Sequence, residues 1–88
     1  MKGVLAIFQG KVQGVGFRFT VCRLAQRFSI TGYVKNLANG TVEIQAFGQE
    51  EDLKTFLDLI QTQTPGQIED VIVSPLDGKS SYKEFTAL

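Results

Sequence analysis

The sequence predicts an α+β fold, a ferredoxin-like βαββαβ sandwich in which an antiparallel sheet carries two helices on one face. Three observations lead to this prediction. Segments rich in β-forming residues and two amphipathic helical segments follow one another in the order strand, helix, strand, strand, helix, strand. An Asn39-Gly40 turn separates the two consecutive strands, as in a β-hairpin. The length of 88 residues suits one domain, so we expect a single domain over residues 1–88.

The amino-terminal third predicts the first strand and the first helix. Residues 4–8 are all apolar, which suits a central strand, and Gly10 and Gly14 interrupt the run. A helix is predicted over residues 17–28, because apolar side chains recur there at intervals of three and four residues with arginine and glutamine between them. The glycine-containing segment between them therefore connects a strand directly to a helix.

The rest of the chain predicts a hairpin, a second helix and two further strands. Residues 30–36 and 41–47 are β-rich, and the second run alternates apolar with polar side chains. Acidic residues at 50–52 favour the first turn of a second helix. Pro65-Gly66 ends that helix. Residues 68–74 are predicted to form the fourth strand, and a turn over residues 75–80 leads to a short extra strand around residues 82–85.

Composition narrows the classes of function. Nine basic and nine acidic residues balance, so charge gives no reason to expect a nucleic-acid or membrane-surface partner. The first apolar run is too short for a signal peptide or a membrane-spanning helix, and we expect a cytoplasmic protein. One cysteine, Cys22, and no histidine make a conventional metal site unavailable, so no metal and no cofactor are expected. Cys22 is interpreted as a packing residue, and a monomer is expected.

The connection after the first strand is the most informative segment, with the sequence GKVQGVGFR over residues 10–18. Glycines let successive backbone N–H groups point into one cavity, and the helix amino terminus adds free N–H groups and a positive dipole end. Arg18 lies in the first helical turn, where its planar guanidinium can bind two phosphate oxygens. Such turns are common, so spacing alone leaves a solvated arginine as the alternative. Phe19 stands where a dinucleotide motif needs glycine, and no P-loop ending is present.

Two segments resemble the signatures of the acylphosphatase family. The sequence GKVQGVGFR over residues 10–18 is similar to the first signature. The sequence GYVKN over residues 32–36, followed at the family's spacing by Gly40, Val42 and Gly48, is similar to the second. The resemblance covers nearly the whole chain, because length and element order also agree with the family.

What the resemblance implies is a hydrolase that splits the carboxyl-phosphate bond of acyl phosphates and releases a carboxylate and inorganic phosphate. Arg18 is implied to bind the phosphate and Asn36 to hold the attacking water. The phosphate-binding residues implied by the first signature are Gln13, Gly14, Val15, Gly16, Phe17 and Arg18. Lys11 and Lys35 also lie inside the signatures, but we expect them to be solvated rather than catalytic.

The chemistry of acyl phosphates agrees with such a site. The leaving carboxylate has a conjugate acid with a pKa of about 4, so it departs without a proton. Catalysis then requires fixed donors for the phosphate charge and a water held in line. Asn36 both donates and accepts but takes no proton, so we expect the substrate's phosphate oxygen to take it, with no covalent intermediate. Leu37 departs from the family, which often has a hydroxyl residue beside this asparagine, and leaves the positioning of Asn36 open.

Other interpretations remain at this point. From the residues alone, Asn36 could simply begin the turn toward Asn39-Gly40. The main alternative function is a ferredoxin-like binding module without turnover. An RNA-recognition module would carry its glycine-aromatic motif on a strand, whereas here that pattern falls on a loop and a helix. A carbamoyl-phosphate-handling domain of hydrogenase maturation factors has a similar first signature but belongs to much longer chains, so we expect a free-standing enzyme. Phe17 and Phe19 point to different helix faces, and one of them can line the substrate site.

Overall fold

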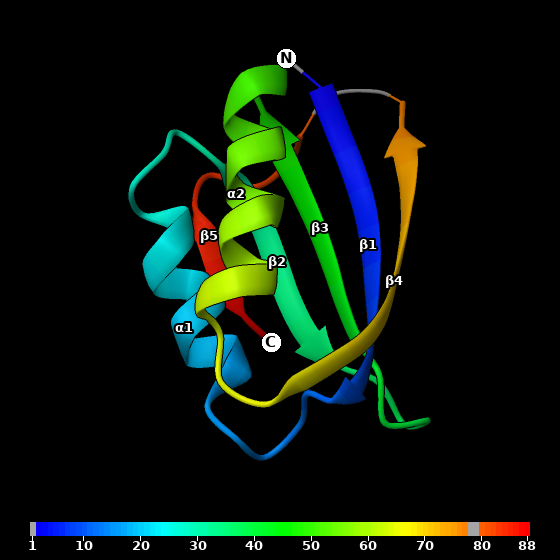
Figure 1. The fold of residues 1–88 in the computed structure, drawn as a ribbon. Helices are drawn as coiled ribbons and strands as arrows, with labels where there is room; N and C mark the ends of the chain where they lie inside the picture. Colours follow the sequence, from blue (N-terminus) through cyan, green and yellow to red (C-terminus); the bar gives the residue numbers. More distant parts are fainter. Residues whose placement is uncertain (1, 78–79) are drawn as a thin grey trace.

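The computed structural model describes residues 2–77 and 80–88, and within them the predicted order of elements is confirmed (Figure 1). In chain order the elements are β1 Lys2–Lys11, α1 Phe17–Ala25, β2 Thr31–Asn36, β3 Val42–Gly48, α2 Glu50–Gln63, β4 Gln67–Leu76 and β5 Phe85–Ala87. The helix α1 ends three residues before the predicted end. Its last turn tightens, because the N–H groups of Arg27 and Phe28 donate to carbonyls three residues earlier, each at 3.1 Å.

The strands form one mixed sheet in the order β4-β1-β3-β2-β5. The pairs β1 with β3, β1 with β4 and β2 with β3 are antiparallel, as predicted. The exception is β5, which pairs with β2 in parallel and begins at Phe85, so the predicted extra strand at residues 82–85 was placed too early. Tyr82 does not belong to this strand. Its ring packs on the rings of Phe47 and Tyr33, with centroids 6.3 and 5.7 Å apart.

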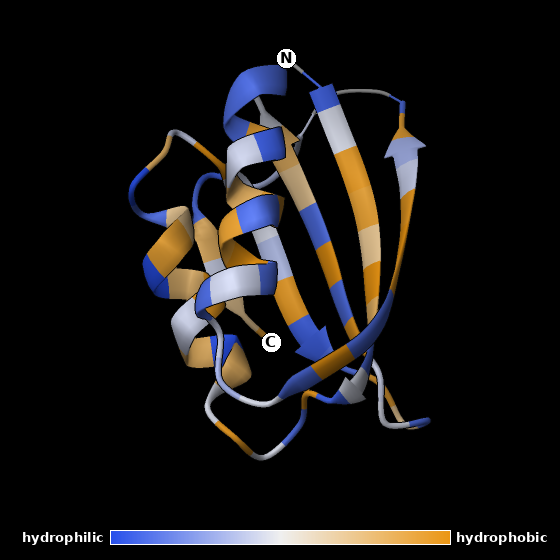
Figure 2. Ribbon diagram, in the orientation of Figure 1, coloured by the Kyte–Doolittle hydropathy of each residue, from blue (hydrophilic) through white to orange (hydrophobic). Residues whose placement is uncertain are grey.

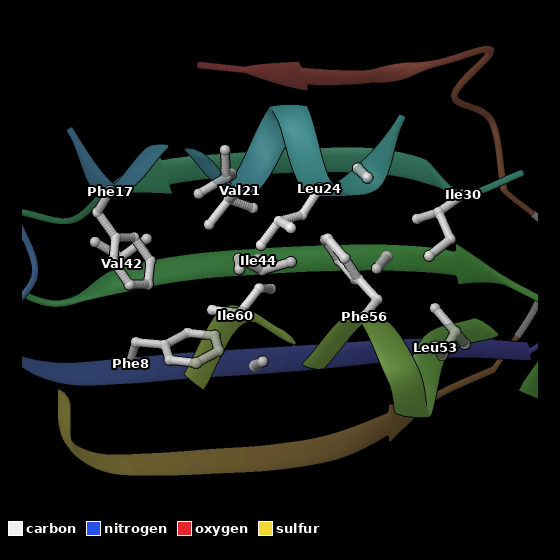
Figure 3. Packing of buried hydrophobic residues seen from close by; sticks show 14 of the residues in the cluster. Phe8, Phe17, Val21, Leu24, Ile30, Val42, Ile44, Leu53, Phe56 and Ile60 are labelled. Atoms are coloured by element: carbon white, nitrogen blue, oxygen red, sulfur yellow. The ribbon is translucent and has the colours of Figure 1, made fainter. Parts of the chain in front are cut away.

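Both helices cover the same face of the sheet, as predicted, and the hydrophobic core lies between them and the strands (Figures 1 and 3). The alternation that predicted β3 is visible along that strand in Figure 2, and its apolar members Val42, Ile44 and Ala46 are fully buried. Phe17 from α1 and Phe56 from α2 complete the core on the helix side, and the side chain of each is at most 1% exposed. Each such side chain contributes about 1.5–3 kcal/mol when fully buried, so this layer is the main stabilising feature.

The pairing of β1 with β4 is irregular near the end of β1, just before the loop that leads to α1. The pairing of β1 with β4 shifts in register between Gln9 and Gly10. Gly10 has φ +123°, and a Cβ atom there would lie 2.2 Å from the main-chain oxygen of Gln67, so only glycine fits. Val12, which follows this irregularity, is buried in the core at 1% exposure. The beginning of the next loop is therefore anchored rather than free.

No helix in the part of the chain that the structure describes is long and apolar enough to cross a membrane.

Candidate active site

A cleft of about 380 Å³ lies where the loop after β1, the first turns of α1 and the ends of β2 and β5 meet. Its lining residues are Val12, Gly14, Gly16, Phe17, Arg18, Phe19, Cys22, Asn36 and Ala87. The cleft therefore brings Arg18 and Asn36 together from separate elements. A larger cavity of about 610 Å³ lies between the end of α1 and the segment before β5, but none of the predicted site residues lines it. The smaller cleft is therefore the candidate site because Arg18 and Asn36 line it, although it is not the larger of the two.

The helix α1 opens into this cleft with free backbone donors. Its N-cap residue, Gly16, adopts the left-handed conformation with φ 85° and ψ 14°, which glycine adopts without strain. The N–H of Thr20 is bonded to the carbonyl of Gly16 at 3.2 Å. The preceding N–H groups of the first turn have no partner of this kind within a helix, and no described side chain caps them. Together with the positive end of the helix dipole, they make this helix end suited to an anion.

The two phenylalanines of the first turn have the different surroundings that the sequence predicted. Phe17 is 1% exposed and packs against Phe8, with ring centroids 5.5 Å apart, so it anchors the start of α1 in the core. Phe19 is 67% exposed and lines the cleft. The guanidinium carbon of Arg23 lies 5.8 Å from its ring centroid, within the range of a cation–π interaction. An aromatic ring is thus held at the rim of the cleft.

Arg18 is oriented by Leu88, the residue that follows β5. Its Nη1 donates a hydrogen bond to the main-chain oxygen of Leu88 at 2.7 Å. Leu88 is itself fixed, because its N–H donates to the carbonyl of Val34 on β2 at 2.8 Å. The guanidinium has several further N–H donors in its planar fork, so this bond positions the group while leaving it able to bind an anion.

Asn36 reaches the cleft because of its place on β2. It is the last residue of the strand and lies opposite Val42. Side chains alternate between the two faces of a strand, so Asn36 lies on the same face as the buried Val34, which is the face that the helices cover. Its exposed side chain lines the cleft together with Arg18. Asn36 therefore ends β2 and lines the cleft, whereas the side chain that bonds within the turn is that of Asn39, whose oxygen accepts from the Thr41 N–H at 3.1 Å.

The residues of the first signature do not all face the cleft. Gly14, Gly16, Phe17 and Arg18 line it, whereas Gln13 and Val15 do not. Val15 is 41% exposed on the loop. Gln13 turns its side chain toward the hairpin, and its Nε2 donates to two main-chain carbonyls there. A contact between Gln13 and phosphate would therefore use its backbone N–H.

Comparison with known proteins places this cleft in context. The family model described as acylphosphatase matches residues 4–87. The chain belongs to the acylphosphatase family. It is 42% identical over 86 residues to an acylphosphatase of Geobacillus kaustophilus, an alignment covering 97% of this chain and 92% of that relative.

Solved structures agree with this assignment. The crystal structure of acylphosphatase from Bacillus subtilis superposes with a TM-score of 0.95 at 32% identity, covering 100% of this chain and 99% of that one. HypF of T. kodakarensis also superposes, with a TM-score of 0.84 at 34% identity, but this chain covers only 12% of it. The family resemblance read from the two signatures is therefore confirmed, and so is the ferredoxin-like fold.

Some residues at this cleft were not predicted as site residues. Ala87 lines the cleft and Leu88 accepts from Arg18. Only the parallel pairing of β5 brings them there, and no local pattern indicates that pairing. Cys22 also lines the cleft. It lies four residues after Arg18 on α1, and this helical spacing could have indicated a shared face.

The surroundings of Cys22 argue against a catalytic thiol. The residue is partly buried and packs against the hydrophobic core, as predicted. Burial raises the pKa of the Cys22 thiol, and the nearby charge of Arg18 offsets only part of that effect. The thiol is therefore protonated at neutral pH, where a nucleophilic cysteine would need to be a thiolate.

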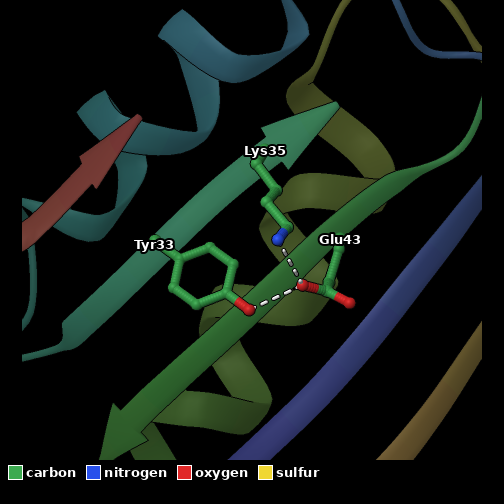
Figure 4. A network of polar contacts seen from close by, with 3 residues as sticks. All are labelled: Tyr33, Lys35 and Glu43. Atoms are coloured by element: carbon green, nitrogen blue, oxygen red, sulfur yellow. Dashed lines mark hydrogen bonds and ion pairs between the residues drawn. The ribbon is translucent and has the colours of Figure 1, made fainter. Parts of the chain in front are cut away.

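Lys35 points away from the cleft. It lies on the open face of the sheet, where its Nζ is 3.7 Å from Glu43 Oε2 (Figure 4). The hydroxyl of Tyr33 donates to the same carboxylate oxygen at 2.6 Å. Burial first, and then the hydrogen bond and charge of Glu43, raise the pKa of Tyr33 above its usual range. Lys35 thus forms a partly exposed ion pair, and the prediction that it does not carry the catalysis agrees with this position.

Proposed function

We propose that this cleft is the catalytic site at which the chain hydrolyses acyl phosphates, the reaction of its family. The phosphoryl group is bound by the loop that precedes α1 and by Arg18, and Asn36 holds the attacking water. The observation that carries the proposal is that Arg18 and Asn36 line one cleft with the uncapped amino terminus of α1.

The phosphate end of the substrate fits the loop and the helix end. Free N–H groups of the first turn supply neutral donors, and Arg18 supplies a charged planar fork for two oxygens. These donors are held in place before substrate arrives, because Phe17 is packed in the core and Leu88 holds the guanidinium. In a loose phosphoryl-transfer transition state, such fixed donors stabilise the charge on the equatorial oxygens.

The attacking water needs orientation rather than a strong base. The carboxamide of Asn36 can accept one hydrogen bond from the water while donating another to the phosphate. The water oxygen attacks phosphorus, the bond from phosphorus to the bridging oxygen breaks, and the carboxylate leaves with the electron pair. The proton of the water passes to a phosphate oxygen. Among the residues that the structure describes, none that lines the cleft is an aspartate or glutamate, and this route requires none.

The RNA-binding alternative is less suited to the sheet. RNA-recognition modules present exposed aromatic side chains on the open face of their strands for base stacking. Here Tyr33 and Phe47 occupy that face, but each is only 6% exposed, and Tyr82 packs against both. Bases could not stack on them without displacing Tyr82. We accordingly propose no nucleic-acid partner, and we expect a monomer in the cytoplasm.

The test is steady-state hydrolysis of benzoyl phosphate in EDTA, with p-nitrophenyl phosphate as the control substrate. We expect EDTA-resistant turnover of the acyl phosphate alone. Arg18→Ala should reduce kcat/KM by about 10²–10³-fold or more, the usual cost of losing a transition-state donor. Arg27→Ala is the matched control, because Arg27 is exposed in the turn after α1 and does not line the cleft. Equal activities of the two variants would refute the assignment.

A further inference from the structure

The side chain of Gln13 joins the phosphate loop, which is residues 12–16 between β1 and α1, to the β2–β3 hairpin. Its Nε2 donates to the carbonyl of Leu37 at 2.8 Å and to the carbonyl of Thr41 at 2.8 Å. These acceptors lie 24 and 28 positions further along the chain, at the two sides of the β2–β3 hairpin. One amide group therefore ties the phosphate loop to the hairpin.

The orientation of this amide is determined by its partners. Both partners are carbonyl oxygens, which only accept hydrogen bonds, so the nitrogen and not the oxygen of the Gln13 amide must face them. The NH₂ group has two hydrogens, and each carbonyl takes one. Neither a shorter polar side chain nor an apolar one of equal length could make both bonds from this loop position.

The bonds end beside the residue proposed to hold the water. Leu37 directly follows Asn36, and Thr41 directly precedes Val42, the partner of Asn36 across the hairpin. The exposed side chain of Asn36 is therefore carried on a short piece of backbone that Gln13 fixes relative to the phosphate loop. From this geometry we infer that Gln13 is a positioning residue, which sets the distance between the bound phosphoryl group and the water on Asn36.

The bonds of Gln13 are not needed to form the hairpin itself. The carbonyl of Leu37 also accepts from the N–H of Gly40 at 3.2 Å, and the carbonyl of Thr41 also accepts from the N–H of Leu37 at 2.9 Å. Each acceptor thus keeps a backbone partner if Gln13 is replaced, so no buried carbonyl is left without a donor. The cost of replacement should therefore appear in catalysis more than in stability. This inference rests on the proposed role of Asn36.

Gln13→Met is the first test variant, because methionine has nearly the same length but no donor. Misplacement of a catalytic group by a fraction of an ångström lowers kcat, so we expect a loss of about 10–100-fold in kcat for benzoyl phosphate. KM and the inhibition constant of inorganic phosphate should change less than about twofold, because the loop and Arg18 remain. Gln61→Met is the matched control. Its amide also donates to a main-chain carbonyl, that of Leu57, but on the exposed side of α2.

A double-mutant cycle with Asn36→Ala tests whether Gln13 acts through Asn36. If it does, Gln13→Met should change kcat by less than about twofold in the Asn36→Ala background, because the group it positions is already absent. An equal loss in both backgrounds, or a wild-type kcat for Gln13→Met, would overturn the inference. Should Asn36→Ala itself keep the wild-type kcat, the proposed role of Asn36 fails instead, so the two failures are distinguishable.

Gln13→Glu provides a second variant should Gln13→Met fold poorly. The introduced carboxyl faces two carbonyl oxygens, which favours its neutral form and raises its pKa above about 4.3. The carboxylate cannot donate, whereas the protonated carboxyl has one O–H and can restore one of the two hydrogen bonds, and its fraction increases as the pH is lowered from 7.5 to 5. We expect kcat relative to wild type to rise as the pH is lowered between these values. A ratio that stays constant or falls would contradict the inference.

Discussion

Arg18 and Asn36 divide the proposed chemistry between a charged fork and a neutral amide. The guanidinium is held by the main-chain oxygen of Leu88 at 2.7 Å, so its orientation is set before substrate binds. The carboxamide of Asn36 is exposed in the cleft and has its position set by the end of β2. One residue should therefore determine mainly the affinity for phosphate and the other mainly the rate of the chemical step.

Two substitutions should separate these roles. Arg18→Lys keeps a positive charge but loses the planar fork, so we expect inorganic phosphate to inhibit at least about tenfold less tightly. Asn36→Ala should leave phosphate inhibition within about threefold of wild type while kcat falls about 10²-fold or more. Competitive inhibition of benzoyl phosphate hydrolysis by phosphate measures both effects. The same pattern for the two variants would contradict the division of roles.

Tyr33 contributes a stability term that depends on pH. Burial and Glu43 raise its pKa in the folded state, so above about pH 10 the unfolded chain loses the phenolic proton while the folded chain keeps it. The stabilisation is therefore complete below about pH 10 and is lost as the pH rises further. Tyr33→Phe should cost about 1 kcal/mol at neutral pH, the worth of one hydrogen bond. Between pH 9 and 11, the free energy of unfolding of the Tyr33→Phe variant should fall less steeply than that of the wild type, as measured by urea denaturation. Parallel curves would exclude this role of Tyr33.

At the scale of the elements, local patterns predicted the helices and four of the strands, because each follows from periodicity or from a short run of apolar or β-forming residues. The alternation of Val42, Ile44 and Ala46 was enough to predict β3. The end of α1 and the start of β5 were displaced by about three residues, because a tightening turn and a parallel edge strand depend on tertiary partners. Tyr82 has a strong β propensity, but it does not extend the strand. Its ring packs on the ring of Phe47 instead.

Stability should depend on β5 through Phe85. This side chain is partly buried, and its ring centroid lies 5.6 Å from that of the fully buried Phe56. We expect Phe85→Ala to lower the free energy of unfolding by about 2 kcal/mol, less than for a fully buried phenylalanine. Phe19→Ala is the matched control, since Phe19 is 67% exposed and its loss should cost under about 0.5 kcal/mol. Equal costs in chemical denaturation would mean that β5 does not dock as described.

At the scale of the whole molecule, the site forms where the ends of several elements converge (Figure 1). Phe8, Phe17 and Val42 lie together at one end of the core (Figure 3), and Phe17 also lines the cleft. The family signatures could indicate Arg18 and Asn36 from the sequence, but not the acceptors of Gln13 or the bond from Arg18 to Leu88. Those contacts join positions 24 to 70 residues apart, and only the assembled sheet brings them together.

The central claim is that the cleft catalyses attack of water on phosphorus. Hydrolysis of benzoyl phosphate in ¹⁸O-labelled water tests it most directly, with the products separated and analysed by mass spectrometry. Attack on phosphorus places one ¹⁸O atom in inorganic phosphate and none in benzoate, and we predict this result for the wild-type reaction. Incorporation of ¹⁸O into benzoate would mean that water attacks the acyl carbon, and would contradict the roles proposed for the phosphate loop, Arg18 and Asn36.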